Sequence, residues 1–415
     1  MNPFRFRLHT LILAVCTFGF LMFSGAAAAE QSFADWLADF RQDALKQGIS
    51  PMTLDAALAD LTPVARAIEL DRSQPEFIST FSSYLSRRVT PERIERGQAL
   101  LSENATLFDE VEARYGVPRA VLAAFWGLET NYGATKGSYS IPAVLATLAY
   151  EGRRHDFFRA QLMDAMRILD AGHIPPADML GSWAGAMGHM QFMPSTFLAY
   201  AVDGDGDDRI DLWQSLPDAM HSAAHYLQTM GWQQDAPIAI EVRLPPGFDW
   251  QQAQLSERKP VAAWTAMDVV AANGDKLPDA DGEAAIVLPQ GWRGPALMVF
   301  DNFDVIMHWN RSINYALSVA LLAQRLEGGA DWSSGIDAEQ EALSFDEMQG
   351  LQQQLTALGF DAGTADGLPG KRTQAAIRSY QQAHDLPMDG YASPSLLRHI
   401  ECCAQSAPVS EELAD

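Results

Sequence analysis

Apolar residues recur at spacings of three and four along most of this chain, from Phe33 to Leu326, and few segments alternate as strands do. This spacing follows the turn of an α-helix, so each segment can bury one side against its neighbours. The pattern predicts a mainly α fold of the α+β class. Hydrophobic residues form 48% of the 415 residues, which is sufficient for a large core and for more than one domain.

The exception to the helical pattern lies between about Ile238 and Val299. There the runs IAIEVRL, AAIVL and ALMVF are short and are separated by Pro, Gly and Asp. Runs of this length and composition are typical of strands. We expect a small β-containing insert, followed by a second helical run from about Asp304 to Leu326.

The N-terminus places Arg5 and Arg7 before an apolar run and a cluster of small residues that ends at Ala29. This order predicts a secretory signal peptide, residues 1–29, and export. A retained anchor is the less favoured alternative, because the apolar run is shorter than the roughly 20 residues of a spanning helix. A lipid anchor at Cys16 is also disfavoured, because Val15 stands where a small residue is wanted. Membrane association is left open.

Charge and cysteine content exclude two classes of protein. The chain has 29 Lys and Arg against 53 Asp and Glu, a formal net charge of −24, and the signal peptide carries two of the Arg. So negative a chain is not expected to bind nucleic acid. Beyond the signal peptide the cysteines are Cys402 and Cys403, adjacent in the tail, so no disulfide framework is expected.

The chain is expected to divide after the helical region. The polar, glycine-bearing stretch from Gly328 is typical of a linker, so we expect a large domain over residues 30–328, a linker over 329–345, a compact domain over 346–400 and a tail over 401–415. Helices joined by glycine turns predict a small three-helix C-terminal domain. Two of its expected apolar faces are formed by Leu351, Leu355 and Leu358, and by Ala376, Ile377 and Tyr380.

Glu129 ends an apolar helix that starts near Pro118. Counting back along the helix places it on the same face as Leu122, Phe125 and Trp126. Desolvation and the negative end of the helix dipole would both raise the pKa of this carboxyl group, as a general acid for glycosidic cleavage requires. Alternatively, Glu129 meets solvent at an ordinary turn, and the pattern alone does not decide between the two.

Five segments then point to a family. LETNYG with its upstream GVP, GSWAGAMGHMQFMPSTF, WNRSINYALSVALLAQRL, DRSQPEF and SYLSRRV resemble the membrane-bound lytic murein transglycosylase B family over the span from Asp71 to Leu326. The resemblance implies a lysozyme-like helical catalytic domain in the periplasm. It also implies cleavage of the β-1,4 bond between N-acetylmuramic acid and N-acetylglucosamine without water, which leaves a 1,6-anhydro end. Glu129 matches the family's single glutamate, which serves as acid and then as base.

A hydrolase would normally need a second carboxylate, whereas this chemistry can use the 2-acetamido group of the substrate. The resemblance implies cleft residues that contact sugar or peptide. These are Tyr84, Arg153, Arg154, Ser182, Gln191, Phe192, Tyr226, Trp309, Asn310 and Tyr315. Only the alignment with the family motifs supports these assignments. Taken alone, Arg153 and Arg154 could form a solvated helix face, and Tyr226 could be a core residue. Trp309 replaces a Tyr of many relatives, and Trp183 and His189 also depart from the family pattern.

The acidic loop DGDGDDRID, from Asp203 to Asp211, places carboxylates at alternate positions, which suits a structural calcium ion. The expected ligands are Asp203, Asp205, Asp207, the carbonyl of Arg209 and, by the family resemblance, Asp218. Asp208 stands where an EF-hand has Gly, and Gln214 stands where it has Glu. The alternatives are a solvated acidic turn and a helix-capping role for Asp218, with the helix beginning at Ala219. The chemistry itself requires no cofactor.

Residues 346–400 resemble the peptidoglycan-binding domain 1 family through LQQQLTALGF and DGLPGKRTQAAIRSYQQAHDLPMDG. Such a module would hold the enzyme near its polymer. We interpret its motif residues as shaping turns and helix starts. They are Asp366, Gly367, Gly370, Thr373, Asp389 and Gly390.

These observations favour a monomeric lytic transglycosylase whose partners are peptidoglycan glycan strands. Enzymes of cell-wall synthesis or division are further candidate partners. The first rival is a hydrolytic muramidase that uses a second carboxylate such as Glu151 or Asp203. The second rival is a non-catalytic wall-binding scaffold that recruits other enzymes.

Overall fold

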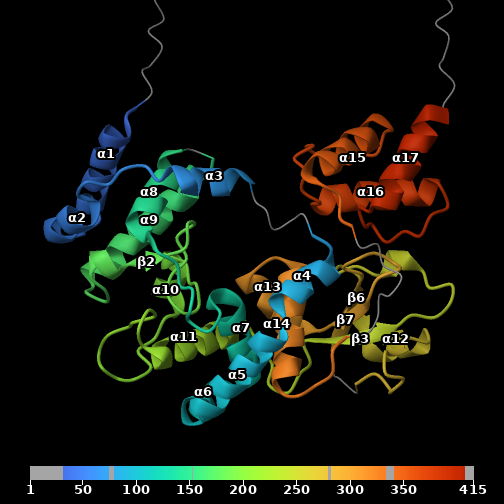
Figure 1. Ribbon diagram of the computed structural model, residues 1–415, viewed down its shortest axis with the longest axis horizontal. Coiled ribbons are helices and arrows are strands. Elements are labelled where there is room, and N and C mark those ends of the chain that lie inside the picture. The colour runs from blue at the N-terminus through green and yellow to red at the C-terminus, as the bar shows by residue number, and fades with distance from the viewer. Residues whose placement is uncertain (1–30, 74–78, 152, 279–281, 333–340, 407–415) are drawn as a thin grey trace, which may run out of the picture.

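The computed structural model describes residues 31–73, 79–151, 153–278, 282–332 and 341–406 (Figure 1). The predicted signal peptide lies outside the described residues, as do part of the predicted linker and the end of the tail. Within the described ranges, every helix falls short of the length and apolar character that crossing a membrane demands.

Helices dominate the described chain, so the predicted mainly α fold is confirmed. Those before the insert are α1 (Phe33–Lys46), α2 (Pro51–Leu58), α3 (Ala65–Ser73), α4 (Phe81–Arg88), α5 (Pro91–Glu103), α6 (Ala105–Tyr115), α7 (Arg119–Thr130), α8 (Ile141–Tyr150), α9 (His155–Asp170), α10 (Pro194–Tyr200) and α11 (Leu216–Thr229). The later ones are α12 (Val261–Ala266), α13 (Asp301–Trp309), α14 (Ile313–Leu326), α15 (Phe345–Ala357), α16 (Lys371–Ala383) and α17 (Pro394–Ser406). Short 3-10 helices lie at Pro176–Asp178 and Trp250–Gln252.

Polar caps divide what the sequence predicts as one helical run from Asp304 to Leu326. α13 ends at Trp309, and Asn310 Oδ1 accepts a hydrogen bond from the Ser312 backbone N–H at 3.1 Å. The Ser312 hydroxyl then caps α14 by accepting from Tyr315 N–H at 3.3 Å. The single-run prediction is wrong because these side chains satisfy backbone groups at a helix boundary.

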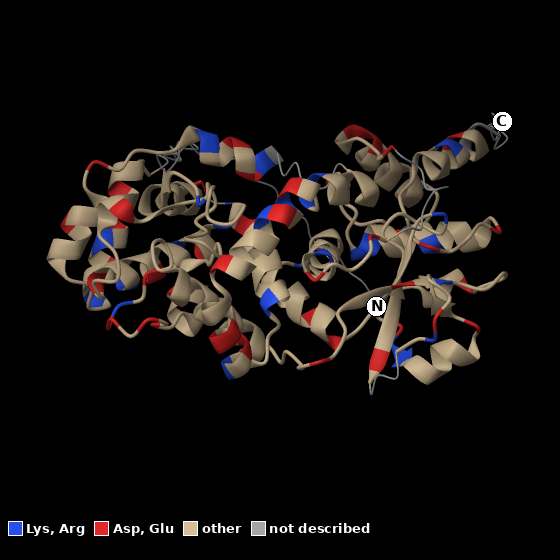
Figure 2. Cartoon of the chain, turned by 60° about the horizontal axis from the view of Figure 1, so that its bottom comes forward, with Lys and Arg blue, Asp and Glu red and all other residues tan. Residues whose placement is uncertain are grey.

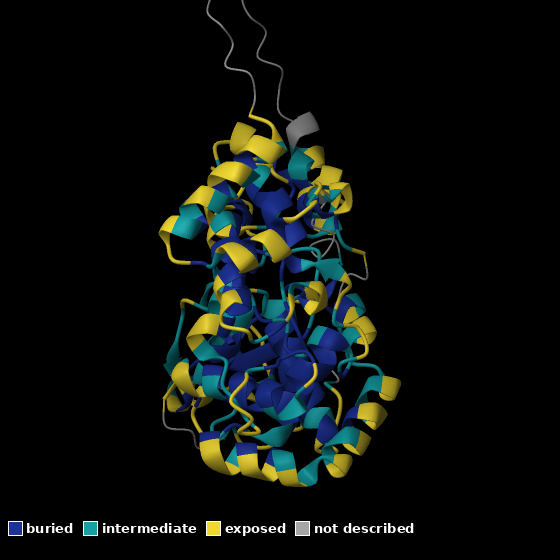
Figure 3. Ribbon diagram, turned by 90° about the vertical axis from the view of Figure 1, so that its left-hand side faces the viewer, coloured by how far each residue is buried: buried dark blue, intermediate teal, exposed yellow. Residues whose placement is uncertain are grey.

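α7 is the most enclosed helix of the described large domain. All its residues from Ala120 to Leu128 are buried, and it packs against α5, α6, α11 and α14. Figure 3 shows the buried residues gathered in the interior of the helical domain. The sequence predicts that only one face of α7 is buried. The structure buries more of the helix than that, because neighbouring helices surround it.

The insert forms a five-stranded antiparallel sheet in the order β4-β6-β7-β3-β5, beside α12. Its strands are β3 (Ala239–Arg243), β4 (Lys259–Pro260), β5 (Val270–Ala271), β6 (Glu283–Val287) and β7 (Ala296–Val299). Val287 and Leu297 face the helical core, whereas Ile286 and Met298 face a second core around Trp264. Burial on both faces explains why the strands are apolar without alternation. A separate two-stranded ribbon pairs β1 (Tyr139–Ser140) with β2 (Leu180–Gly181).

The C-terminal domain consists of α15, α16 and α17, as predicted, and has its own core. Leu351, Leu355, Ile377 and Tyr380 are fully buried there, but Leu358 caps α15 and is 45% exposed, so its predicted place on the apolar face is wrong. In Figure 1 this domain lies over the sheet of the insert. Lys and Arg are scattered among more numerous Asp and Glu (Figure 2).

Candidate active site

Glu129 lies in the last turn of α7, as predicted, and it is the one residue between Ala120 and Thr130 that is not buried. Its Oε1 atom accepts two hydrogen bonds from helices remote in sequence. Trp309 Nε1 donates at 3.0 Å from the end of α13, and the Tyr315 hydroxyl donates at 2.5 Å from the start of α14. Its Oε1 is therefore held by residues of α13 and α14, and Glu129 is partly exposed at the end of an otherwise buried helix.

The electrostatics keep Tyr315 a donor. Burial raises the pKa of its hydroxyl well above the ordinary value, and the nearby negative charge of Glu129 adds to that effect. Tyr315 therefore stays protonated at any physiological pH. Hydrogen bonds to a carboxylate favour its charged form, whereas burial favours the neutral form. The raised pKa expected for Glu129 stays a prediction.

An aromatic cluster surrounds the indole that contacts Glu129. The Trp309 ring centroid lies 4.5 Å from that of Phe125, 5.1 Å from Tyr226 and 5.2 Å from Phe192. Segments far apart in sequence thus bring Phe192 and Tyr226 together around the indole that donates to Glu129. Phe125, Phe192 and Tyr226 are buried, at 0%, 2% and 8% exposure, so they pack behind the indole, and the sugar contacts of Phe192 and Tyr226 stay predictions.

The turn after α7 has an uncommon backbone. Asn131 and Tyr132 have φ values of 49° and 59°, both in the left-handed region, and Gly133 follows at 79°. Thr130 secures this turn, since its hydroxyl donates to His189 O at 2.8 Å and accepts from Gly133 N–H at 2.9 Å. Strained residues of this kind are concentrated at functional sites. The turn ties the end of α7 to the glycine-rich segment.

The Tyr132 ring occupies a space that two glycines leave open. A Cβ atom at Gly97 of α5 would lie 2.2 Å from the Tyr132 hydroxyl oxygen, and one at Gly127 of α7 would lie 2.7 Å from its Cζ. The hydroxyl donates to Arg93 O at 2.9 Å. The ring therefore locks the turn after Glu129 against both helices.

His189, which departs from the family pattern, braces α7. Trp126 Nε1 donates to His189 Nδ1 at 2.9 Å. Burial, aided by the positive charge of Lys136, lowers the pKa of His189 to about 4. The imidazole is therefore neutral at pH 7, and its proton is on Nε2 because Nδ1 accepts.

Ser182 and Gln191, two of the predicted cleft residues, form hydrogen bonds within and next to the glycine-rich segment that contains them. Ser182 Oγ accepts from Ala186 N–H at 3.0 Å. Gln191 has a φ of 50°, and its amide nitrogen donates to Lys136 O at 3.2 Å and Gly188 O at 3.1 Å. These contacts shape the glycine-rich segment, and the substrate-binding roles of both residues stay predictions.

The remaining predicted contacts occupy other positions. Arg153 forms a bidentate ion pair with Asp71, through Nη2–Oδ1 at 2.5 Å and Nε–Oδ2 at 2.6 Å, and Arg154 lies 4.3 Å over the Phe157 ring. Tyr84 is 7% exposed on α4, with the Arg88 guanidinium 5.3 Å from its ring. Asn310 is held by the cap of α14 described above. Neither Arg153 nor Arg154 contacts Glu129 in the described part of the chain, so their saccharide or peptide contacts stay predictions.

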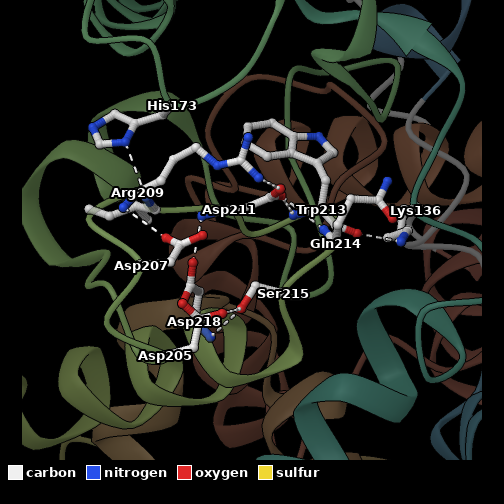
Figure 4. A network of polar contacts seen from close by, with 11 residues as sticks. Lys136, His173, Asp205, Asp207, Arg209, Asp211, Trp213, Gln214, Ser215 and Asp218 are labelled. Atoms are coloured by element: carbon white, nitrogen blue, oxygen red, sulfur yellow. Dashed lines mark hydrogen bonds and ion pairs between the residues drawn. The ribbon is translucent and has the colours of Figure 1, made fainter.

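The acidic loop is organised by its own carboxylates (Figure 4). Oxygen atoms of Asp203, Asp205 and Asp218 lie within 4.8 Å of one another. Asp218 is 1% exposed, and burial raises the pKa of its carboxyl group. The carboxylate of Asp207 is not part of this cluster, and its Oδ1 accepts from Arg209 N–H at 2.9 Å. The ligand role of the Arg209 carbonyl stays a prediction.

Asp218 does not cap its helix, contrary to the alternative considered from the sequence. α11 begins at Leu216, and the Ser215 hydroxyl is the cap, accepting from Asp218 N–H at 3.2 Å. The Asp218 carboxylate instead points back into the loop, where it accepts from Gly204 N–H at 2.8 Å and Asp211 N–H at 2.6 Å.

Thr130, Tyr132 and His189 are parts of the site that the sequence did not assign a role. Their contribution depends on left-handed backbone and on contacts between segments, neither of which leaves a periodic signal. The run TNYG was the nearest indication, because Asn and Gly tolerate the left-handed region.

Comparison with known proteins identifies the families to which two parts of the chain belong. Residues 32–324 match the transglycosylase SLT domain family, and residues 346–400 match a peptidoglycan binding domain family. Membrane-bound lytic murein transglycosylase B of Escherichia coli (strain K12) is 29% identical over 254 residues, which span 58% of this chain and 66% of that protein, just under two thirds.

Two solved structures extend the comparison. SltB3 from Pseudomonas aeruginosa, in complex with NAG-anhNAM-pentapeptide, has a TM-score of 0.87 and 45% identity, covering 89% of this chain and all (100%) of that one. The E. coli lytic transglycosylase Slt35 in complex with calcium has a TM-score of 0.61 and 25% identity, covering 72% of this chain and 94% of that one. The chain belongs to the SLT-domain transglycosylases. Within them it is a lytic transglycosylase of the SltB type.

Proposed function

We propose that Glu129 alone carries out the acid and base steps of peptidoglycan cleavage in this chain. The observation that carries the proposal is the Glu129 carboxylate, which accepts from Trp309 and Tyr315 at the partly exposed end of an otherwise buried helix. A single positioned carboxyl group can serve both steps when the nucleophile belongs to the substrate.

The two steps balance without water. In the first, Glu129 gives its proton to the glycosidic oxygen as the bond from C1 of N-acetylmuramic acid to O4 of N-acetylglucosamine breaks. The 2-acetamido group stabilises the positive charge at C1. In the second, the C6 hydroxyl attacks C1 and its proton returns to Glu129, so the product is a 1,6-anhydromuramic end.

The hydrolytic rival needs a second carboxylate, and the two candidates from the sequence are engaged elsewhere. Glu151 pairs with Arg72 at 2.9 Å. Asp203 accepts backbone hydrogen bonds from Gly206 at 2.6 Å and Asp208 at 2.9 Å within the acidic loop. These contacts favour the water-free reaction.

Analysis of the products tests the proposal. Purified sacculi would be digested with the mature protein, and the released fragments would be identified by mass spectrometry. The proposal expects ends that are lighter than reducing muramic ends by one water molecule. Reducing ends alone would instead support the muramidase, and the absence of any release would support the non-catalytic scaffold.

Calcium is a second proposal for this chain. Asp203, Asp205 and Asp218 provide hard oxygen ligands that converge, which fits a calcium ion. The loop also connects to the cleft, since Asp211 Oδ1 accepts from Trp213 N–H at 2.9 Å and Trp213 O accepts from Lys136 Nζ at 2.5 Å (Figure 4). The backbone oxygen of Lys136 in turn accepts a hydrogen bond from the Gln191 side-chain amide. A bound ion would thus stabilise the wall of the cleft.

A melting experiment tests the calcium proposal. Excess calcium should raise the melting temperature relative to chelator, because an ion at 100 times its Kd stabilises the folded state by about 2.7 kcal/mol. The Asp218→Asn variant should lose most of that shift. Equal melting temperatures of the parent protein with calcium and with chelator would refute an occupied site.

The location and the oligomeric state are also proposals. The N-terminal sequence supports export to the periplasm, and the relative from E. coli is described as membrane-bound. We propose a monomer that acts on glycan strands beside other cell-wall enzymes. Fractionation of cells with an antibody to the C-terminal domain, and the mass of the purified protein in solution, test these points.

A further inference from the structure

An open cavity lies where the insert meets the C-terminal domain. Its volume is about 220 Å³, and Glu129, Trp309 and Tyr315 are not among its lining residues. The insert contributes Trp292 and Arg293, and the C-terminal domain contributes Leu386, Ser393 and His399. A hollow shared by two domains is a frequent place for a binding site.

One wall of this cavity is formed by Asp389, and one of its hydrogen bonds joins the two domains. Asp389 is 8% exposed, and its Oδ2 accepts from Trp292 N–H at 2.9 Å across the domain boundary. Its Oδ1 accepts from Gln381 Nε2 at 2.7 Å and Tyr391 N–H at 2.9 Å. A Cβ atom at Gly291 would lie 2.9 Å from Asp389 Oδ2, so the close approach requires glycine. The backbone of Trp292 is therefore fixed.

The Trp292 side chain remains 40% exposed at the cavity. Its ring centroid lies 5.8 Å from that of Trp250, and the Arg293 guanidinium lies 4.9 Å from the ring. An aromatic plate next to polar side chains is the combination that binds a sugar, whose apolar face stacks while its polar groups form hydrogen bonds. Within the described residues Arg293 has no carboxylate partner, so its charge can pair with a carboxylate on a ligand.

We propose that this cavity is a second glycan site, which takes an N-acetylated sugar of a peptidoglycan strand and places the carboxylates of its peptide near Arg293. The inference rests on the proposed function, because that function names the polymer. A chain that holds its substrate at two separate points raises the effective concentration of uncut strand at the cleft. The C-terminal domain then binds the wall together with the insert.

Nuclear magnetic resonance of the tryptophan indoles tests the site in the intact protein. The mature chain with Glu129→Gln, which prevents turnover, would be labelled with ¹⁵N and titrated with a soluble, uncross-linked peptidoglycan tetrasaccharide that carries its peptides. The Trp292 signal, identified by its loss in Trp292→Phe, should shift and saturate. A shift of the Trp309 signal without one of Trp292 would overturn the second site and leave the proposed function standing. If neither signal shifts, the proposed function fails as well.

A binding assay on insoluble sacculi provides the second measurement. In the Glu129→Gln background, Trp292→Ala should weaken binding about 2- to 10-fold, the range for one stacked ring. Leu358→Ala is the matched control, because it truncates an exposed side chain of the same C-terminal domain outside the cavity. Unchanged binding by Trp292→Ala, or equal losses in both variants, would contradict the proposal.

Discussion

Glu129 and Asp389 are both acidic side chains set among apolar groups, yet the structure uses them in opposite ways. Asp389 is 8% exposed, and backbone and amide N–H groups hold both of its oxygens. Glu129 reaches solvent, and an indole and a phenol both approach its Oε1. Asp389 joins two domains through Trp292, whereas the function proposed for Glu129 requires it to exchange a proton with a substrate. Burial alone does not identify a catalytic carboxylate, and the kind of donor around it is more informative.

Replacing the carboxyl group of Glu129 should have the largest effect. Glu129→Gln should lower turnover of sacculi by about 10³-fold, because general acid–base catalysis contributes on the order of 10²- to 10⁴-fold. The measurement is release of anhydromuramic fragments. Glu151→Gln is the matched control and should keep its activity, since Glu151 pairs with Arg72. Comparable losses in both variants would argue for two catalytic carboxylates.

Removing the donors to Glu129 should have the next largest effect. Trp309→Phe and Tyr315→Phe each keep a ring and remove one donor, so kcat should fall about 10- to 100-fold, since a hydrogen bond to a charged group contributes about 1.5–3 kcal/mol. The two variants separate positioning from sugar stacking. If Trp309→Phe changes only KM, the indole serves as a wall of the cleft and does not orient the carboxylate.

The backbone after each acid offers a smaller test. Gly390 follows Asp389 with a φ of 71°, and an added Cβ would lie 2.8 Å from the Arg378 guanidinium. Gly390→Ala should therefore cost about 1–2 kcal/mol in the unfolding of the C-terminal domain. Asn131→Gly, at the corresponding turn after Glu129, should change stability by less than about 1 kcal/mol. Denaturant titration followed by tryptophan fluorescence measures both, and a larger loss for Asn131→Gly would contradict the comparison.

The smallest expected effect is a pH dependence from Asp389. Burial raises the pKa of this carboxyl group above its ordinary value of 3.8. The folded state therefore binds the proton of Asp389 more tightly than the unfolded state does. The contribution of this proton to the free energy of unfolding is complete below pH 3.8, and it is lost as the pH rises through the pKa of Asp389 in the folded state. Stability relative to Asp389→Asn should accordingly increase as the pH is lowered from 7 toward 4, by about 1.4 kcal/mol for each tenfold difference in proton affinity between the folded and unfolded states. Melting curves of both proteins over this range measure it, and a constant difference would exclude the raised pKa.

The sequence predicts the fold well because its main signals are periodic. Helical spacing predicts the α domain, and the apolar runs predict the strands of the insert. The break between α13 and α14 was missed because one polar cap, Ser312, outweighs an otherwise continuous apolar pattern. The enclosure of α7 on every side could not be seen either, since it depends on which helices surround it.

The site was only partly predictable. Periodicity placed Glu129 at a helix end. Of the residues that the family resemblance named, Trp309 and Tyr315 donate hydrogen bonds to Glu129, and Phe192 and Tyr226 pack against the Trp309 ring. No spacing rule could show that these residues converge, because they belong to separate helices and loops. Arg153 was named on the same grounds, but the structure shows its guanidinium engaged by a carboxylate of α3.

The Tyr132 ring between Gly97 and Gly127 limits how this enzyme can diverge. A side chain at either glycine would displace the ring and, with it, the turn that follows Glu129. Loss of the ring alone would leave a void between two helices. Neutral drift at these three positions therefore has to be concerted, with a smaller residue at position 132 arising together with a larger one on α5 or α7. Among distant homologues, the three positions should vary as one unit.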